Sequence, residues 1–228
     1  MEAVQTIALM MGTAWASGIN LYATVLMLGW MGSTGQVDLP PGLEVLTAPS
    51  VMFAAGLMYC VEFFADKVPG VDTGWDTIHT FIRIPAGAIM AAGAAEGLDI
   101  GPAAELTALL LGGALSATSH ATKAGTRVLI NTSPEPVTNW IASITEDLVV
   151  IGGLWASLNH PWWFLAGLVL FLLLVAWLLP RIWRALKRIA RAVGRWFGRR
   201  DDPAPAEAFE ERRRDVLREL YEDKRDKT

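Results

Sequence analysis

The stretch PWWFLAGLVLFLLLVAWLLP, residues 161–180, decides the fold class of this chain. It contains no charged residue, and tryptophan occurs near both of its ends. A helix needs about 20 mostly apolar residues to cross a bilayer, and tryptophan favours the two membrane interfaces. The stretch is therefore predicted to be a transmembrane helix.

The residues before this stretch also have the composition of a membrane domain. Residues 1–180 hold four of the 19 Lys and Arg residues and 13 of the 23 Asp and Glu residues, a net charge of −9. Soluble domains carry roughly a quarter charged residues. A block of this length with so few basic residues excludes a soluble globular enzyme and a nucleic-acid-binding domain, and it predicts that the protein lies in a membrane.

Hydrophobic runs predict an all-α, polytopic membrane protein with about six transmembrane helices. Their approximate ranges are 5–30, 50–67, 77–97, 103–124, 138–158 and 161–180. The loops on one side contain no Lys or Arg: 31–49, 97–102 and 158–161. The loops on the other side, near 67–76 and 124–137, are bordered by Lys67, Arg83, Lys123 and Arg127. Because basic loops stay inside, we expect a multi-pass protein of the cell inner membrane with both termini in the cytoplasm.

The loops after the second and fourth spans are alike, being long, turn-rich and charged. An ungapped comparison aligns Asp76 with Asn139 and Arg83 with Glu146. Spans two and three would then form a tandem helix-pair repeat with spans four and five. Locally broken or kinked helices are expected at residues 18–20 and 84–87, because glycine, asparagine and proline interrupt helices there.

Each of the first five spans has one polar face, since its polar residues recur at spacings of three, four and seven. The candidate solute- or ion-binding residues on these faces are Asn20, Glu62, Asp66, Asp76, His79, Arg83, His120, Lys123, Arg127, Asn139, Glu146 and Asp147. A charged side chain in hydrocarbon costs at least about 2.5–3.5 kcal/mol, so the five faces must converge on a common interior. With Asp72, that interior holds six carboxylates against four basic residues, Lys67 included.

Two interpretations of these charges remain open. They line a wet cavity, in which Glu146 and Asp147 lie deepest, or they form structural ion pairs that fix helix packing at the cytoplasmic rim. His79 and His120 lack an obvious metal-ligand spacing, so no metal site and no cofactor is predicted. The single Cys60 permits no intramolecular disulfide.

Three runs of the sequence resemble the signature blocks of the domain-of-unknown-function 4126 family of integral membrane proteins. The runs are SGINLYATVLMLGW, EFFADKVPGVDTGWDTIHTFIRIPAGA and SHATKAGTRVLINTSPEPVTNWIASITED. The resemblance covers roughly residues 5–160. It implies a polytopic helical membrane protein of bacterial type and implies no particular activity.

The 48 residues after Pro180 have a different composition, with 15 basic and 10 acidic residues. Residues 181–200 are predicted to form a separate basic amphipathic helix that begins at Pro180. Such a helix lies on the anionic lipids of the inner leaflet, at about 1 kcal/mol per basic residue near the surface. Residues 201–228 are predicted to be a charged cytoplasmic tail, either helical or mobile. The chain therefore divides into a transmembrane domain (1–180), the interfacial helix and the tail.

These observations predict a small secondary transporter, coupled to protons or cations, with a polar cavity open to the cytoplasm. Arg83 and Lys123 would hold an anionic or zwitterionic solute, while the acidic residues would bind the coupling ion. The alternatives are a non-transporting scaffold or assembly protein with structural ion pairs, and an ion channel. No HExxH, GxSxG or glycine-rich phosphate loop occurs, so no enzyme is expected. Expected partners are the bilayer, the solute or ion and a second copy of the chain, but not nucleic acid.

Overall fold

The computed structural model describes residues 3–97, 101–132, 136–196, 209–210 and 212–214, and every regular element in these ranges is helical. The elements are α1 (Ala3–Ser33), the 3₁₀ helix η1 (Pro41–Thr47), α2 (Pro49–Ala65), α3 (Val71–Ala95), α4 (Pro102–Ile130), α5 (Pro136–Asn159) and α6 (Pro161–Trp196). The all-α prediction is confirmed. The chain divides into two compact units, Met1–Leu186 and Lys187–Thr228.

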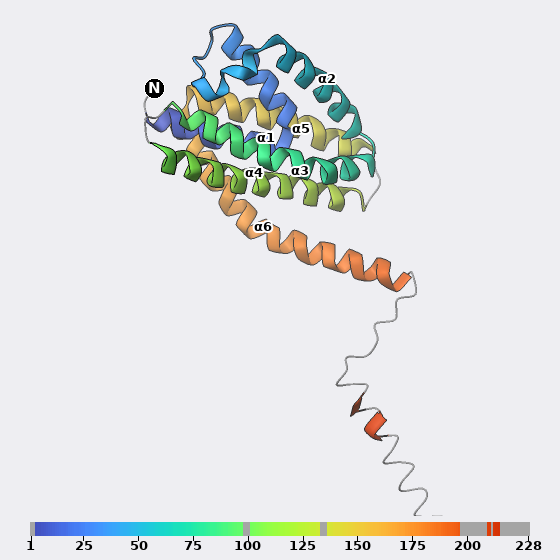
Figure 1. Ribbon diagram of the computed structural model, residues 1–228. Coiled ribbons are helices and arrows are strands. Elements are labelled where there is room, and N and C mark those ends of the chain that lie inside the picture. Colours follow the sequence, from blue (N-terminus) through green and yellow to red (C-terminus); the bar gives the residue numbers. More distant parts are fainter. Residues whose placement is uncertain (1–2, 98–100, 133–135, 197–208, 211, 215–228) are drawn as a thin grey trace, which may run out of the picture. The chain divides into compact units, whose positions relative to one another are not determined.

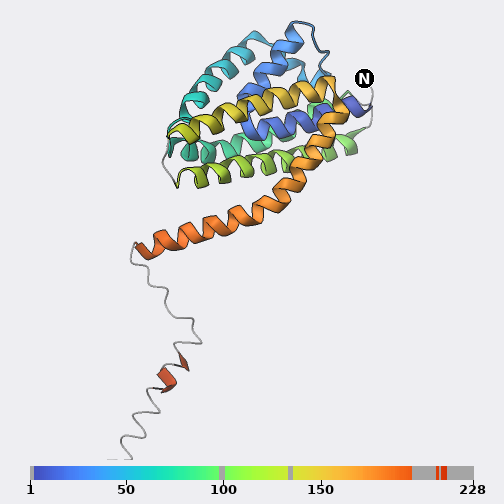
Figure 2. The ribbon, with the colours of Figure 1, turned by 180° about the vertical axis from the view of Figure 1, so that it is seen from behind.

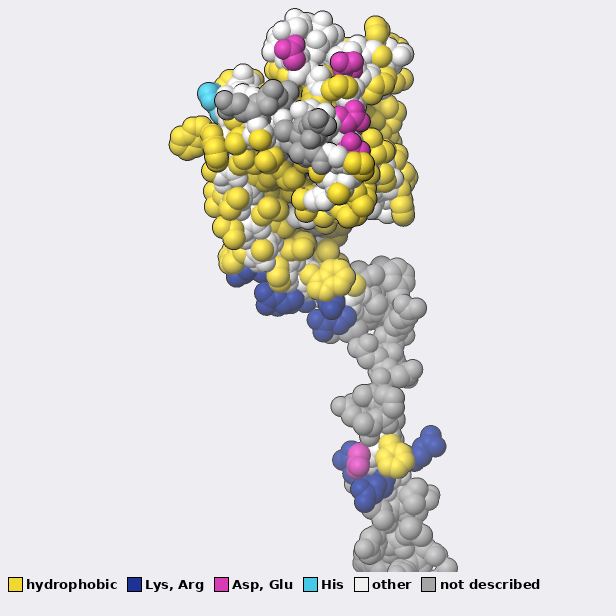
Figure 3. All heavy atoms as spheres, turned by 60° about the vertical axis from the view of Figure 1, so that its left-hand side comes forward, with side chains coloured by type: hydrophobic (Ala, Val, Ile, Leu, Met, Phe, Trp, Pro, Cys, Tyr) yellow, Lys and Arg dark blue, Asp and Glu magenta, His cyan; other side chains and the backbone are white. Residues whose placement is uncertain are grey.

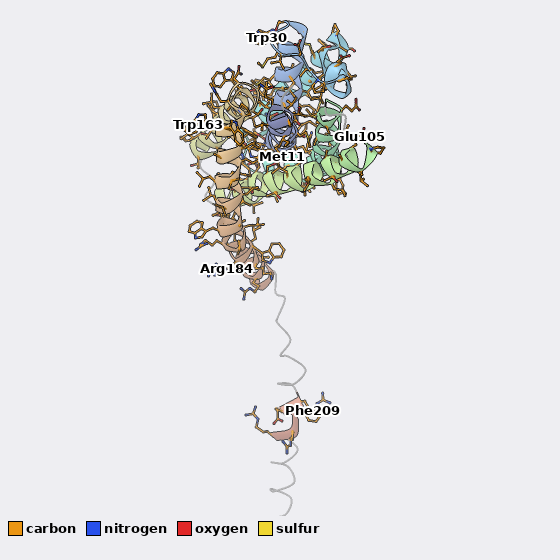
Figure 4. All side chains as sticks on the ribbon, turned by 90° about the vertical axis from the view of Figure 1, so that its left-hand side faces the viewer. Met11, Trp30, Glu105, Trp163, Arg184 and Phe209 are labelled. Atoms are coloured by element: carbon orange, nitrogen blue, oxygen red, sulfur yellow. The ribbon has the colours of Figure 1, made fainter. Side chains whose placement is uncertain are left out.

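Helix α1 is the centre of the first unit. It packs against η1 and each of the helices α2, α3, α4 and α5, and α3 and α4 lie side by side along much of their length (Figures 1 and 2). Trp15 of α1 makes edge-to-face contacts with Phe164 and Phe171 of α6. The apolar core consists of two clusters of buried side chains, and Met11, labelled in Figure 4, packs against both of them. The central position of α1 places its midpoint within reach of the polar faces of its neighbours.

Helix α1 is broken at Asn20, as the sequence predicts. Asn20 has extended backbone angles (φ −145°, ψ 96°) inside an otherwise helical segment. Its side-chain oxygen accepts the N–H of Ala23 at 3.0 Å, which caps the second half of the helix. A Cβ atom on Gly18 would clash with the Ser119 hydroxyl and with the Ser116 carbonyl. Glycine at position 18 therefore allows α1 to approach α4 closely beside the break.

The second predicted break, at residues 84–87, does not occur. Helix α3 continues from Val71 to Ala95 with Pro85 inside it. Pro85 removes the N–H group that would bond the Phe81 carbonyl, so one hydrogen bond of the helix is missing there, yet the helix continues. Nearby, the hydroxyls of Ser17 and Ser116 both donate to the carbonyl of Arg83, at 3.3 and 2.9 Å. These two bonds link α3 to α1 and α4 at this point.

The 31–49 segment contains more structure than the loop expected there. η1 places Leu43 and Leu46 in the apolar core, and it meets α2 at an angle of 68°. The two helices together have the length and composition of one bent or re-entrant membrane segment.

Three further helical segments are long and apolar enough to cross a membrane: Val71–Ala95, Val137–Asn159 and Pro161–Ala192. Large apolar side chains on their outer faces are exposed, among them Phe81 and Trp163, which are 82% and 81% accessible. Hydrophobic side chains cover much of the flank, and acidic side chains gather at one end of it (Figure 3). The structure therefore supports a membrane protein with three such helices, or four segments with the bent pair.

The separate basic helix predicted after Pro180 is an error, because α6 runs without interruption from Pro161 to Trp196. Pro180 lacks an N–H group for the carbonyl four residues earlier, yet this single loss does not end the helix. The Arg184 side chain donates to the Pro180 carbonyl at 3.1 Å. The basic residues from 181 onward therefore continue the last membrane helix. Residues 197–200 lie outside the described residues, as does the predicted tail except for residues 209–210 and 212–214, which are helical.

Candidate functional site

Eight ionisable side chains from α2, α3, α4, α5 and the turn after α2 meet in the interior of the first unit. We call them the charged cluster: Glu62, Asp66, Asp72, Asp76, Arg83, Lys123, Arg127 and Glu146. Their spacing in the sequence explains the meeting. Asp72, Asp76 and Arg83 share one face of α3, and Lys123 and Arg127 share one face of α4.

Arg83 is completely buried in the charged cluster. Its Nη2 atom lies 2.5 Å from Glu62 Oε1, and its Nη1 atom lies 3.0 Å from Asp76 Oδ1. All three side chains are 0–1% accessible to solvent. The same Nη1 atom lies 3.3 Å from Nδ1 of His120. One guanidinium therefore links α2, α3 and α4.

Lys123 joins the charged cluster to the break in α1. Its ammonium donates to Asp66 Oδ2 at 2.9 Å and to Glu62 Oε1 at 3.2 Å. It also donates to the backbone carbonyl of Ile19 at 3.1 Å. In an unbroken helix the N–H of Ala23 would bond that carbonyl, but here the N–H bonds the Asn20 side chain. The break thus frees an acceptor that Lys123 uses.

Arg127 binds the carboxylate of Glu146 through two parallel contacts, Nη2 to Oε2 at 2.6 Å and Nε to Oε1 at 3.2 Å. Paired contacts of this kind are the strongest type of ion pair. Its Nη1 atom donates to the carbonyls of Asp66 and Asn139, at 2.9 and 3.3 Å. Asp72, in turn, accepts from the Asn131 amide at 2.7 Å. Arg127 therefore holds the ends of α2, α4 and α5 together.

Asp147 lies beside the charged cluster and has neutral partners. Its two oxygens accept from Asn20 Nδ2 at 2.9 Å and from the Tyr59 hydroxyl at 3.1 Å. Asp147 therefore contacts the break in α1 through the side chain of Asn20.

The two histidines and Asn139 also have specific partners. His79 lies 3.0 Å from the Tyr22 hydroxyl and stacks on Trp75. His120 lies 2.8 Å from the Thr80 hydroxyl, and Asn139 donates to Asn131 at 2.9 Å. All twelve sequence-derived candidates thus lie on the interior faces of the first unit. His120 contacts Arg83 directly, whereas the contacts of His79 are with Tyr22 and Trp75 at the edge of the cluster.

Several participants were not among those candidates. Asn131 follows Arg127 by four residues and so continues the polar face of α4 by one turn. The same spacing rule could have identified it. Tyr59 precedes Glu62 by three residues on the same face of α2. Tyr22 and Thr80 give no such signal, because their roles depend on how the helices are rotated about their axes.

Lys67 was expected to pair with a carboxylate, but its partners in the structure are of other kinds. It donates to the Phe63 carbonyl at 3.0 Å and lies over the Phe63 ring, 2.9 Å from the ring centroid. Its third partner is the Ser143 hydroxyl at 3.4 Å. None of the carboxylates that the structure describes lies within ion-pair distance of it. The short turn after α2 directs this ammonium toward aromatic rings.

The charged cluster holds five carboxylates against three basic groups, an excess of two negative charges. Adding Asp147 and Lys67 leaves the same excess, as the sequence predicts. Four polar atoms of the cluster are buried without a hydrogen-bond partner: Glu62 Oε2, Asp66 Oδ1, Asp76 Oδ2 and Arg83 Nε. Such a cluster can take up protons or a small cation, because a buried carboxylate without a compensating charge is costly.

The charged cluster is closed to solvent. Its side chains are 0–5% accessible, except for Glu146 at 19%. Glu146 and Asp147 were expected to be the deepest carboxylates, but both are only partly buried. Glu146 is the most accessible member of the cluster, because α5 lies at the edge of the bundle and packs mainly on α1. Arg83 and Glu146 have different partners and do not form an ion pair in the structure.

Cavities between α4 and α6, at the ends of α1 and α5, and between α5 and α6 have no charged member of the cluster in their walls. The first, about 600 Å³, is an apolar groove whose walls include Gly125, Val128 and Ile182. Within the described residues, no group of three or more His, Cys, Asp or Glu side chains is arranged to hold a metal ion.

Comparison with known proteins assigns the chain to a family without assigning an activity. The sequence model described as "Domain of unknown function (DUF4126)" matches residues 7–181, which include every member of the charged cluster. No match was found among curated proteins or among solved structures. The chain belongs to the DUF4126 family.

Proposed function

We propose that this protein is a six-span membrane protein that acts as a small secondary transporter coupled to protons. In this proposal α1 and α4 cross the membrane together with α2, α3, α5 and α6. α1 is interrupted at Asn20, and α4 contributes Lys123 and Arg127 to the charged cluster. Neither helix is therefore uniformly apolar. Both termini lie in the cytoplasm in this proposal, which is supported by the basic residues near the turns after α2 and α4 and by those of α6 after Pro180. The basic part of α6 then lies at the anionic inner leaflet.

The observation that carries the proposal is the excess of two carboxylates in the charged cluster. A purely structural ion network in a membrane has no need of unbalanced charge, because each ion taken out of water costs several kcal/mol unless it is paired. Glu62, Asp66 and Asp76 each keep one buried oxygen without a partner. The cluster therefore has the capacity to hold one or two protons at neutral pH.

The position of the charged cluster supports transport. Transporters build their sites where a helix is discontinuous, since freed backbone groups can then bind the ion or solute. Here Lys123 and Asn20 meet at the break in α1. Protonation of Glu62 or Asp66 would weaken their bonds to Lys123, which would loosen the link between α4 and the break. In this proposal the buried charged cluster is a closed state of the transport cycle.

The geometry favours a positive over a negative species as the first one bound. Arg83 and Lys123, expected to hold an anionic or zwitterionic solute, already contact carboxylates. An anion would have to displace these partners, whereas a proton would bind to oxygens that have none. The anionic part of a solute would therefore enter only after protonation.

The first test is whether the cluster holds protons. Infrared spectra of the purified full-length protein at pH 7 should contain the band of buried protonated carboxyl groups, and Glu62→Gln should reduce it. Glu105→Gln is the matched control, because Glu105 is exposed near the start of α4 (Figure 4). If all carboxyl groups are ionised, the proposal loses the observation on which it depends.

The second test is transport itself. Proteoliposomes with an internal pH indicator would be challenged with a panel of small anionic, zwitterionic and cationic solutes. At least one solute should drive proton flux that Glu62→Gln abolishes and Glu105→Gln retains. Proton binding without flux for any solute would exclude the transporter.

The alternative of a non-transporting scaffold is favoured by one specific observation, the direct contacts among nearly inaccessible charges. A scaffold would tolerate exchange of Arg83 and both of its carboxylate partners for apolar residues of similar size. The triple variant Arg83→Met, Glu62→Met and Asp76→Leu tests this. A folded triple variant that supports normal growth of cells dependent on the protein would identify a scaffold, whereas a folded but inactive one would favour the transporter.

A further inference from the structure

The Lys123 ammonium lies among five oxygen atoms that come from four other segments of the chain. The oxygens belong to Asp66 (2.9 Å), the Ile19 carbonyl (3.1 Å), Glu62 (3.2 Å), Glu146 (3.5 Å) and Asp76 (3.8 Å). We call them the oxygen cage. The Lys123 side chain is 2% accessible, so the cage is closed around its ammonium.

The oxygen cage fits a primary ammonium group better than a metal ion. Three of its oxygens lie at hydrogen-bond distance, which matches the three N–H donors of an ammonium. Among the described side chains, no group of three or more His, Cys, Asp or Glu residues is arranged to hold a metal ion.

Burial of a lysine does not by itself produce such an environment in this protein. Lys67 is also buried, yet its ammonium contacts a ring, a carbonyl and a hydroxyl. The cage also has more acceptors than Lys123 uses. Glu62, Asp66 and Asp76 each have a second oxygen that is buried without a partner. Spare acceptors around a closed ammonium site indicate that it can hold a positively charged ligand with its own N–H donors.

We propose that the oxygen cage is the binding site for the primary ammonium group of a solute, and that Lys123 occupies it when no solute is bound. This inference rests on the proposed transport function and adds the class of solute, a small primary amine that is cationic or zwitterionic. The ammonium of the solute enters as that of Lys123 leaves. If the departing Lys123 ammonium then loses its proton to water, one proton is released for each ammonium bound, and the interior keeps its charge.

The test uses the full-length protein in detergent and needs no transport. Lys123→Ala removes the ammonium of the protein and should leave the cage empty. Methylammonium chloride should therefore raise the melting temperature of this variant in a saturable manner. Tetramethylammonium chloride has no N–H donors and should give no shift at equal ionic strength. Lys67→Ala is the matched control, and methylammonium should not stabilise it beyond the wild-type protein.

Calorimetric binding provides the second measurement. Lys123→Ala should bind methylammonium at least tenfold more tightly than the wild-type protein, because the lysine competes for the cage. If Lys123→Ala does not fold without ligand, Lys123→Gln takes its place. Equal binding by wild type and variant, no binding by either, or equal stabilisation by tetramethylammonium would overturn the proposal.

These results separate the inference from the proposed function. Binding of methylammonium to Lys123→Ala together with a lack of proton flux in the wild type would retain the ammonium site and exclude the transporter. Proton flux driven only by solutes without an amino group would retain the transporter and exclude the ammonium site.

Discussion

The helix pair α3 and α4 has two halves that are held together in opposite ways. In the charged half, from Asp72 to Arg83 on α3, ionised side chains form the contacts. In the close-packed half, from Gly87 to Ala95, small residues bring the two backbones together, and a Cβ on Gly112 would clash with that of Ala91. Both halves are buried, yet only the charged half could change its contacts when a proton or cation binds. The difference suggests that one half supports the bundle and the other responds to ligands.

The largest effect is expected from Arg83→Met, which leaves Glu62 and Asp76 without their guanidinium. Removal of one partner from a buried ion pair costs about 3–5 kcal/mol. The free energy of unfolding, measured in mixed micelles, should fall by this amount. Lys67→Met, which also removes a buried basic group but no carboxylate contact, should cost about 1–2 kcal/mol. Equal losses would mean that the charged half is not held by its ion pairs.

Gly112→Leu tests the close-packed half. The larger side chain must separate α3 from α4, and overpacking of this kind costs about 1–3 kcal/mol. The loss should be the same at pH 5 and pH 8, since no titratable group lies at this contact. Gly152→Leu is the control, because nothing lies within 4 Å of a Cβ at Gly152. A strongly pH-dependent loss would contradict the separation of the two halves.

Asn20→Ala tests the break that borders the charged half. The substitution removes the cap on Ala23 and the bond to Asp147, and loss of a helix cap costs about 0.5–2 kcal/mol. Asn159→Ala is the comparison, since Asn159 is exposed and bonds only the Trp155 carbonyl of its own helix. Unfolding free energies that match for the two variants would show that the cap is unimportant.

The smallest effect is expected from Tyr22→Phe, at the edge of the charged half. It removes one neutral hydrogen bond to His79, worth about 0.5–1.5 kcal/mol. Thr107→Val removes an exposed hydroxyl that bonds the Ala103 carbonyl of its own helix, so it should lower the melting temperature by less. If Tyr22→Phe lowers the free energy of unfolding as much as Arg83→Met does, the contact between Tyr22 and His79 belongs to the core of the cluster.

The sequence identified the helices and the members of the charged cluster because both depend on simple spacing. Polar residues at helical spacing inside apolar spans have to face one another, so Arg83, Lys123 and Glu62 were found without knowledge of the fold. Their pairing was not predictable. It depends on how far each helix is rotated and shifted, which is why Glu146 meets Arg127 and Lys123 and why Lys67 contacts a ring.

The two proline positions show a second limit of sequence reasoning. Pro85 and Pro180 were expected to mark a break and a helix start, but both lie inside continuous helices. Each proline removes one N–H group, and the loss of a single hydrogen bond does not end a helix whose other bonds remain and that packs in a bundle. Asn20, by contrast, has a side chain that can cap a helix, so the break at that residue has a local cause.

The break in α1 also has an electrostatic consequence. The peptide dipoles of a helix add up to about half a positive charge at its N-terminus and half a negative charge at its C-terminus. In an intact α1 these partial charges would lie at the ends of the helix. The break brings one end of each kind into the interior, where the carbonyl of Ile19 meets the cation of Lys123 and the capped N-terminus at Asn20 meets the carboxylate of Asp147. A backbone interruption thus supplies both signs of partial charge at one place, without adding another ionisable residue.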